Sequence, residues 1–129
     1  MKKILVVEDE IAYSRLLHDQ LTTAGYQVVL AEDGERGLSM AKSEKPDLIL
    51  LDIKLPKMDG MAMLDLLRKE PNGKTVKVII LTNLEANEKI IQEVTQDLPT
   101  YYCIKSDTKL DDLIEKIKTT LSDKPLTIS

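Results

Sequence analysis

Short runs of consecutive apolar residues punctuate the chain. Several are rich in β-branched side chains, and together they cover residues 4–7, 28–31, 48–51, 78–81 and 101–104. Within each run the residues are uniformly apolar, without the alternation of a strand that has one face in water. This pattern is typical of strands buried on both faces, as in a parallel sheet. We therefore expect each run to form one strand of such a sheet.

Segments with helical spacing separate these runs. The clearest covers 110–121, where apolar residues recur every three or four positions opposite charged ones. We expect a helix over 11–24, which ends at Gly25, and a second over 33–43, with Asp33 as its N-cap. A third should run from Asp59 and Gly60 to the turn at Pro71, and a fourth should cover 85–96. Strands and helices thus alternate throughout. This order predicts an α/β fold with helices on both faces of a parallel sheet.

Length and composition restrict the possible functions. A chain of 129 residues suits one domain, which we place at 1–122, with a C-terminal tail at 123–129. The net charge of −4 argues against direct nucleic-acid binding. No apolar run approaches the length of a membrane span, and a single cysteine, Cys103, fits a reducing compartment. We therefore expect a cytoplasmic domain that binds neither nucleic acid nor membrane.

Polar residues that can carry chemistry follow four of the predicted strands. Glu8 and Asp9 follow the first strand, Asp52 the third, Thr82 the fourth and Lys105 the fifth. In a doubly wound sheet the carboxyl ends of parallel strands meet at one edge, where ligands bind. The sequence therefore predicts three carboxylates, a hydroxyl and an ammonium at one site.

This combination favours phosphoryl chemistry supported by a hard cation. Neighbouring carboxylates repel one another unless a cation shares them, and an all-oxygen set with few ligands suits Mg²⁺. The ammonium and hydroxyl can bind phosphoryl oxygens, and one carboxylate can attack phosphorus. Taken one at a time, acidic residues at strand ends have a simpler interpretation as helix N-caps. Asp9 could cap the first helix and Asp59 the third.

Four segments resemble the receiver domain of two-component response regulators. They are ILVVEDE at 4–10, LLDIKLPKMDG at 50–60, VIILT at 78–82 and YCIK at 102–105. Their order and spacing make the resemblance specific, and it covers about residues 2–122. It implies a flavodoxin-like, doubly wound sheet of five parallel strands in the order 2-1-3-4-5.

The resemblance also implies roles for the carboxylates. Asp52 would accept a phosphoryl group from a histidine kinase or phosphotransfer protein. Asp9, Asp52 and the backbone carbonyl of Lys54 would bind Mg²⁺, and Glu8 would act through a metal-bound water. Lys105 would pair first with Asp52 and then with the phosphoryl oxygens.

The resemblance further implies a conformational change on phosphorylation. Thr82 would turn toward the phosphoryl group and Tyr102 would swing inward, changing the surface formed by the helix over 85–96, the last strand and the last helix. That surface would signal to a downstream output protein or domain. The resemblance also implies that one class of receivers dimerises through arginine–carboxylate pairs on this surface. The unphosphorylated chain is expected to be a monomer, because its arginines all precede this surface: Arg15, Arg36 and Arg68.

Two other functions remain open from the residues alone. The first is a receiver-like binding module that works without phosphorylation, since Ser106 stands where the family usually has proline and Asn83 where it prefers a small residue. The second is a phosphohydrolase, which usually has a second acid two residues after the nucleophile, where this chain has Lys54. We expect no turnover of a separate substrate.

Overall fold

The computed structural model describes residues 1–83, 100–105 and 108–122. Five parallel strands form one sheet in the order β2-β1-β3-β4-β5. The strands are β1 (Lys3–Val7), β2 (Gln27–Ala31), β3 (Leu48–Leu51), β4 (Lys77–Thr82) and β5 (Thr100–Ile104). The predicted parallel sheet and its strand order are therefore confirmed.

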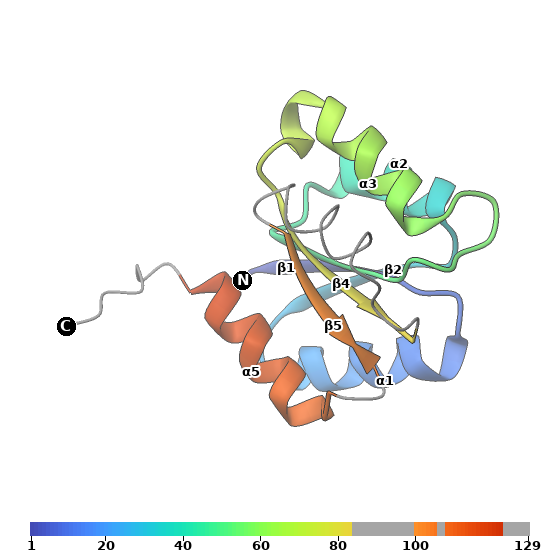
Figure 1. Cartoon of the computed structure of the whole chain (residues 1–129). Coiled ribbons are helices and arrows are strands. Elements are labelled where there is room, and N and C mark those ends of the chain that lie inside the picture. The colour runs from blue at the N-terminus through green and yellow to red at the C-terminus, as the bar shows by residue number, and fades with distance from the viewer. Residues whose placement is uncertain (84–99, 106–107, 123–129) are drawn as a thin grey trace.

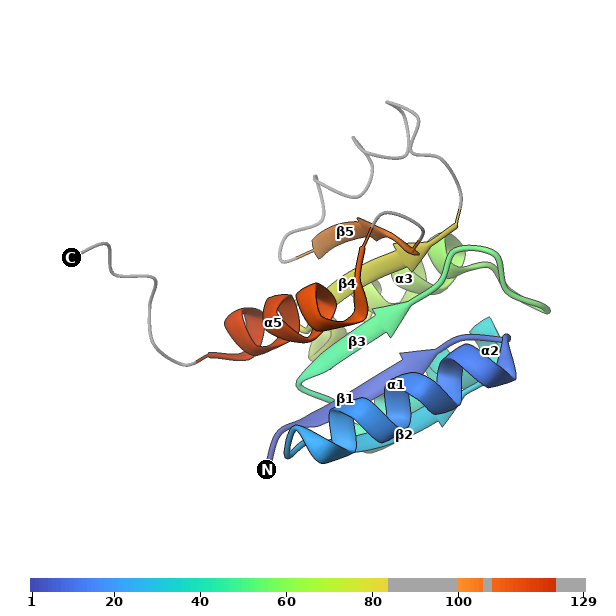
Figure 2. The same cartoon turned by 90° about the horizontal axis from the view of Figure 1, so that it is seen from below.

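Helices cover both faces of the sheet. They are α1 (Ile11–Thr23), α2 (Gly34–Glu44), α3 (Gly60–Lys69), the short 3-10 turn η1 (Pro71–Gly73) and α5 (Leu110–Leu121). Helices α2 and α3 pack on one face, and α1 and α5 pack on the other (Figures 1 and 2). The helix expected over 85–96 lies outside the described residues, as do Ser106 and the tail at 123–129. No helix in the described ranges combines the length and apolar character that a membrane span requires.

The core consists of two apolar layers that share the sheet. In β1, Leu5 and Val7 belong to the cluster under α2 and α3, whereas Ile4 and Val6 belong to the cluster under α1 and α5. All four side chains are buried. Because neighbouring residues in a strand point to opposite faces, burial on both sides requires apolar residues at every position. This requirement explains the continuous apolar runs of the sequence.

Local contacts fix where the helices begin and end. The Asp33 side chain accepts a hydrogen bond from the Arg36 amide at 2.7 Å, and Asp59 accepts one from the Ala62 amide at 2.8 Å. Both predicted N-caps are therefore confirmed. Gly25 has a φ of 99° after the end of α1, as a helix-terminating glycine should. The capping alternative for Asp9 is wrong, because α1 starts after Glu10 and has no side-chain cap.

Candidate functional site

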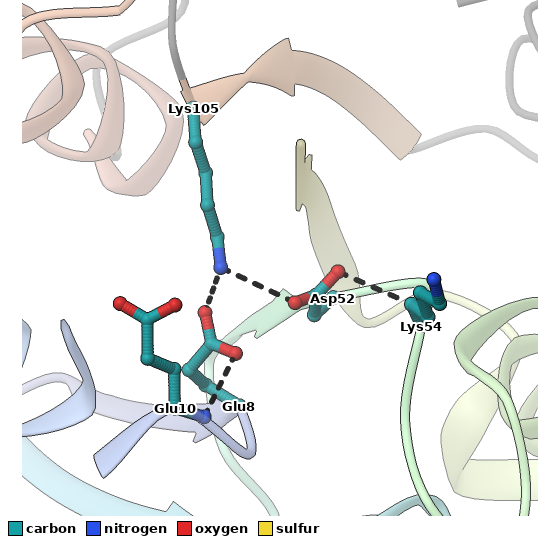
Figure 3. Close-up of polar contacts among 5 residues, drawn as sticks. All are labelled: Glu8, Glu10, Asp52, Lys54 and Lys105. Atoms are coloured by element: carbon teal, nitrogen blue, oxygen red, sulfur yellow. Dashed lines mark hydrogen bonds and ion pairs between the residues drawn. The ribbon is translucent and has the colours of Figure 1, made fainter. Parts of the chain in front are cut away.

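The carboxyl edge of the sheet brings together residues that are far apart in sequence. Glu8 follows β1, Asp52 follows β3 and Lys105 follows β5. Strands β1 and β3 are hydrogen-bonded neighbours, and the Asp52 amide donates to the Val7 carbonyl at 3.0 Å. Figure 3 shows the Lys105 side chain extending from the end of β5 to place its ammonium between Glu8 and Asp52.

Lys105 joins the two buried carboxylates. Its Nζ donates to Oε1 of Glu8, and it also donates to Oδ2 of Asp52 at 3.2 Å. The side chains of Lys105, Glu8 and Asp52 are only 8%, 3% and 10% exposed. Burial alone would lower the pKa of Lys105, but the hydrogen bond to Glu8 and the charges of both carboxylates raise it above its usual value. The two carboxylates therefore favour the charged form of the Lys105 ammonium.

Asp52 is held from two sides. Its Oδ1 accepts a hydrogen bond from the Lys54 amide at 3.3 Å, while Oδ2 contacts Lys105. The chain then turns back so that the Gly60 amide donates to the Ile53 carbonyl at 2.7 Å. A Cβ at position 60 would lie 2.0 Å from the Asp52 carbonyl oxygen, so this close approach requires glycine.

Ionisation of the buried Glu8 carboxylate is disfavoured. Burial raises the pKa of Glu8 to about 7, and the charge of Asp52 adds to this rise, although the hydrogen bond from Lys105 opposes it. The Glu10 amide also donates to Oε2 of Glu8 at 3.3 Å. Burying several acids beside a single ammonium is thus electrostatically costly, and an additional cation would lower that cost.

The acidic group has a donor set that fits a divalent cation. One carboxylate oxygen from each of Glu8, Asp9 and Asp52 lies within 4.8 Å of the others. Asp9 is exposed, whereas the other two are buried. They open on a cleft of about 530 Å³, which Lys54, Pro56, Asn83 and Lys105 also line. Hard oxygen donors beside an open cleft suit Mg²⁺, which retains several water ligands.

For the predicted switch residues, Thr82 and Tyr102, the structure describes only the backbone. Thr82 is the last residue of β4 and pairs with Ile104, the residue before Lys105, and Tyr102 pairs with Ile80. Their side chains lie outside the part of the chain that the structure describes. The predicted movements of Thr82 and Tyr102 therefore stay predictions.

Sequence reasoning missed a contact of Lys105 with an aromatic ring. The Lys105 ammonium lies 4.6 Å from the centre of the Tyr13 ring. Tyr13 belongs to the first turn of α1 and packs against the cluster under α1 and α5. From the sequence, Tyr13 is expected on the first helix, near the carboxyl end of the first strand, on the side that the family resemblance associates with docking of the kinase. That edge location is the one signal that could have indicated proximity to the site.

Comparisons with known proteins agree with this arrangement. Residues 4–118 match the family described as the response regulator receiver domain. A probable transcriptional regulator, ycf27 of Cyanophora paradoxa, is 46% identical over 83 residues, which cover 64% of this chain and 34% of that protein. This chain spans about a third of the length of such curated relatives.

Solved structures extend the similarity to nearly the whole chain. A CheY-like receiver domain from Methanospirillum hungatei has a TM-score of 0.82 at 32% identity, covering 94% of each chain. The response regulator TrrA of Thermotoga maritima, solved in complex with Mg²⁺ and BeF, has a TM-score of 0.79 at 34% identity. That alignment covers 93% of this chain and 99% of TrrA.

Proposed function

The chain belongs to the response regulator receiver family, and we propose that it accepts a phosphoryl group on the carboxylate of Asp52. Receivers of this family act as phosphorylation-switched domains in two-component signalling. The observation that carries the assignment is the position of Asp52. Its buried carboxylate faces the cleft, with one oxygen bound by the Lys54 amide and the other by Lys105.

Receivers bind Mg²⁺ at an acidic pocket, and this chain has the corresponding acids. We propose that Asp9, Asp52 and the backbone carbonyl of Lys54 hold the ion and that Glu8 acts through a bound water. The ion would neutralise charge on the phosphoryl oxygens. The grouping of three carboxylates within 4.8 Å supports this proposal.

The transfer step is proposed as an in-line displacement at phosphorus. An oxygen of Asp52 forms a bond to phosphorus while the phosphorus–nitrogen bond of a phosphohistidine donor breaks. The electron pair of the broken bond stays on the imidazole nitrogen, which takes up a proton. The product on this chain is an acyl phosphate. The Lys105 ammonium, which pairs with Asp52 and Glu8 in the resting site, then pairs with the phosphoryl oxygens and stabilises their charge.

The proposed partners follow from the chemistry. A histidine kinase or phosphotransfer protein supplies the phosphoryl group, and a downstream output protein or domain receives the signal. Thr82 and Tyr102 are the proposed switch residues that link the acyl phosphate to β5 and to the surface beside α5. The chain promotes its own phosphorylation and dephosphorylation and turns over no separate substrate. An acyl phosphate changes charge only locally, so a two-state element must transmit the change.

Intact mass measurement after incubation with acetyl phosphate tests the proposed function. The wild-type chain should gain one phosphoryl group in Mg²⁺ and almost none in EDTA. Asp52→Asn should abolish the gain, because the nucleophilic carboxylate is lost. Asp47→Asn is the matched control, since Asp47 precedes the same strand at its opposite end. Equal phosphorylation of the Asp52 and Asp47 variants would contradict the assignment.

A further inference from the structure

The ammonium of Lys105 has a partner that is not an acid. Among the described residues it contacts Glu8, Asp52 and the ring of Tyr13. The distance of 4.6 Å from Nζ to the ring centre lies within the range of a cation–π interaction. The Lys105 side chain is 8% exposed, so little water competes for this contact. The ring is therefore one of the groups that hold the ammonium in the resting site.

The three partners differ in what happens to them during the proposed reaction. Glu8 and Asp52 belong to the acidic group that would share a metal ion, and Asp52 also becomes the acyl phosphate. The Tyr13 ring ligates no metal and forms no bond to phosphorus. A ring face also attracts a cation without the strict direction of a hydrogen bond. The ammonium can thus move from Glu8 to a phosphoryl oxygen while staying near the ring.

The Tyr13 ring is also packed against the core. Tyr13 is half-buried in the first turn of α1 and packs against the apolar cluster that α1 shares with α5. This packing restricts the positions that the ring can take, so the ring offers a defined location for the charge of Lys105.

We propose that Tyr13 is a positioning residue for the phosphoryl-accepting site, acting through its ring face on the Lys105 ammonium. This role rests on the proposed function, because the exchange of Lys105 onto phosphoryl oxygens is part of it. The ring carries the effect and the hydroxyl is dispensable. Phenylalanine at position 13 therefore preserves the role, whereas an aliphatic residue of similar burial removes it.

The contact itself is tested first, without any phosphoryl donor. In NMR spectra of the metal-free protein, the ε-methylene protons of Lys105 should be shifted upfield by the ring current. The shift should persist in Tyr13→Phe and vanish in Tyr13→Leu. Tyr26→Leu is the matched control, because Tyr26 packs against the same cluster but follows the opposite end of α1. Lys105 ε-protons at ordinary shifts in the wild-type protein would overturn the proposal even if Tyr13→Leu failed to fold.

The reaction is tested next, with phosphorylation rates from acetyl phosphate and with Mg²⁺ affinities. Tyr13→Leu should slow phosphorylation by about three- to tenfold, and Tyr13→Phe should restore the rate to within about twofold of wild type. The Mg²⁺ dissociation constant should change less than the rate in both variants, since the ring is not a ligand. Equal rates in the leucine variant and the wild type would refute the positioning role alone. A wild-type chain that takes up no phosphoryl group would refute the proposed function, and the role of Tyr13 with it.

Discussion

Replacing Lys105 with methionine should destabilise the metal-free protein, because two buried carboxylates would lose their cation. At 3.2 Å from Asp52 the attraction is about 5 kcal/mol for an effective dielectric constant near 20, before the cost of burying the charge. Methionine avoids the cost of burying an ammonium, and the acids lie beside an open cleft. We therefore expect a net loss of about 2–3 kcal/mol in the free energy of unfolding, near the low end for a broken buried pair.

Urea denaturation and thermal denaturation, both followed by circular dichroism in EDTA and then in excess Mg²⁺, measure this effect. The corresponding fall in midpoint temperature is about 10 °C in EDTA for a domain of this size. Mg²⁺ stabilises both folded proteins, but it should reduce the difference between them, because the acids bind the ion more tightly where no ammonium repels it. Lys42→Met is the control, since the Lys42–Glu70 pair is 48% and 41% exposed and should contribute less than about 1 kcal/mol. A Lys105→Met protein as stable as wild type in EDTA would refute the electrostatic reasoning.

Further predictions concern the metal site and assembly. Asp9→Asn should weaken Mg²⁺ binding by about tenfold or more in calorimetric titration, because a charged oxygen ligand is lost, whereas Asp19→Asn, at an exposed position of α1, should leave it unchanged. The unphosphorylated chain should be a monomer at micromolar concentration in light scattering. We also expect no compact dimer after beryllofluoride treatment. A dimer held by arginine–carboxylate pairs beside α5 would need arginines there, but Arg15, Arg36 and Arg68 lie on α1, α2 and α3. Lysine cannot replace them, because it lacks the bidentate geometry of arginine. A compact dimer would contradict this expectation.

The sequence predicted the carboxyl ends of the strands better than their beginnings. The runs ended at Val7, Ala31 and Leu51, as the strands do. Strands β1, β2 and β4 instead begin one residue earlier than expected, at Lys3, Gln27 and Lys77. The backbone of each of these residues joins the sheet while its side chain is polar. Apolar patterning reports burial of side chains, so it does not detect such residues.

The candidate site was predictable where topology alone sets the geometry. Strand order brings Glu8, Asp52 and Lys105 to one edge whatever the details of packing, so their convergence followed from the predicted sheet. The contact between Tyr13 and Lys105 depends instead on where α1 begins and how its first turn packs. The capping alternative for Asp9 is wrong for the same reason, because the first turn of α1 starts one residue later than that role requires.

Chemical mapping of the acyl phosphate identifies the carboxylate that accepts the phosphoryl group. Borohydride reduces an aspartyl phosphate to homoserine, and peptide sequencing by mass spectrometry then identifies the modified position. After incubation with acetyl phosphate and Mg²⁺, we expect homoserine at position 52 alone, with Glu8 and Asp9 unmodified. The buried carboxylate of Asp52 is the one held by both the Lys54 amide and Lys105. Reduction at Asp9 or Glu8, or a phosphorylated chain without homoserine at position 52, would show that Asp52 is not the phosphoryl acceptor.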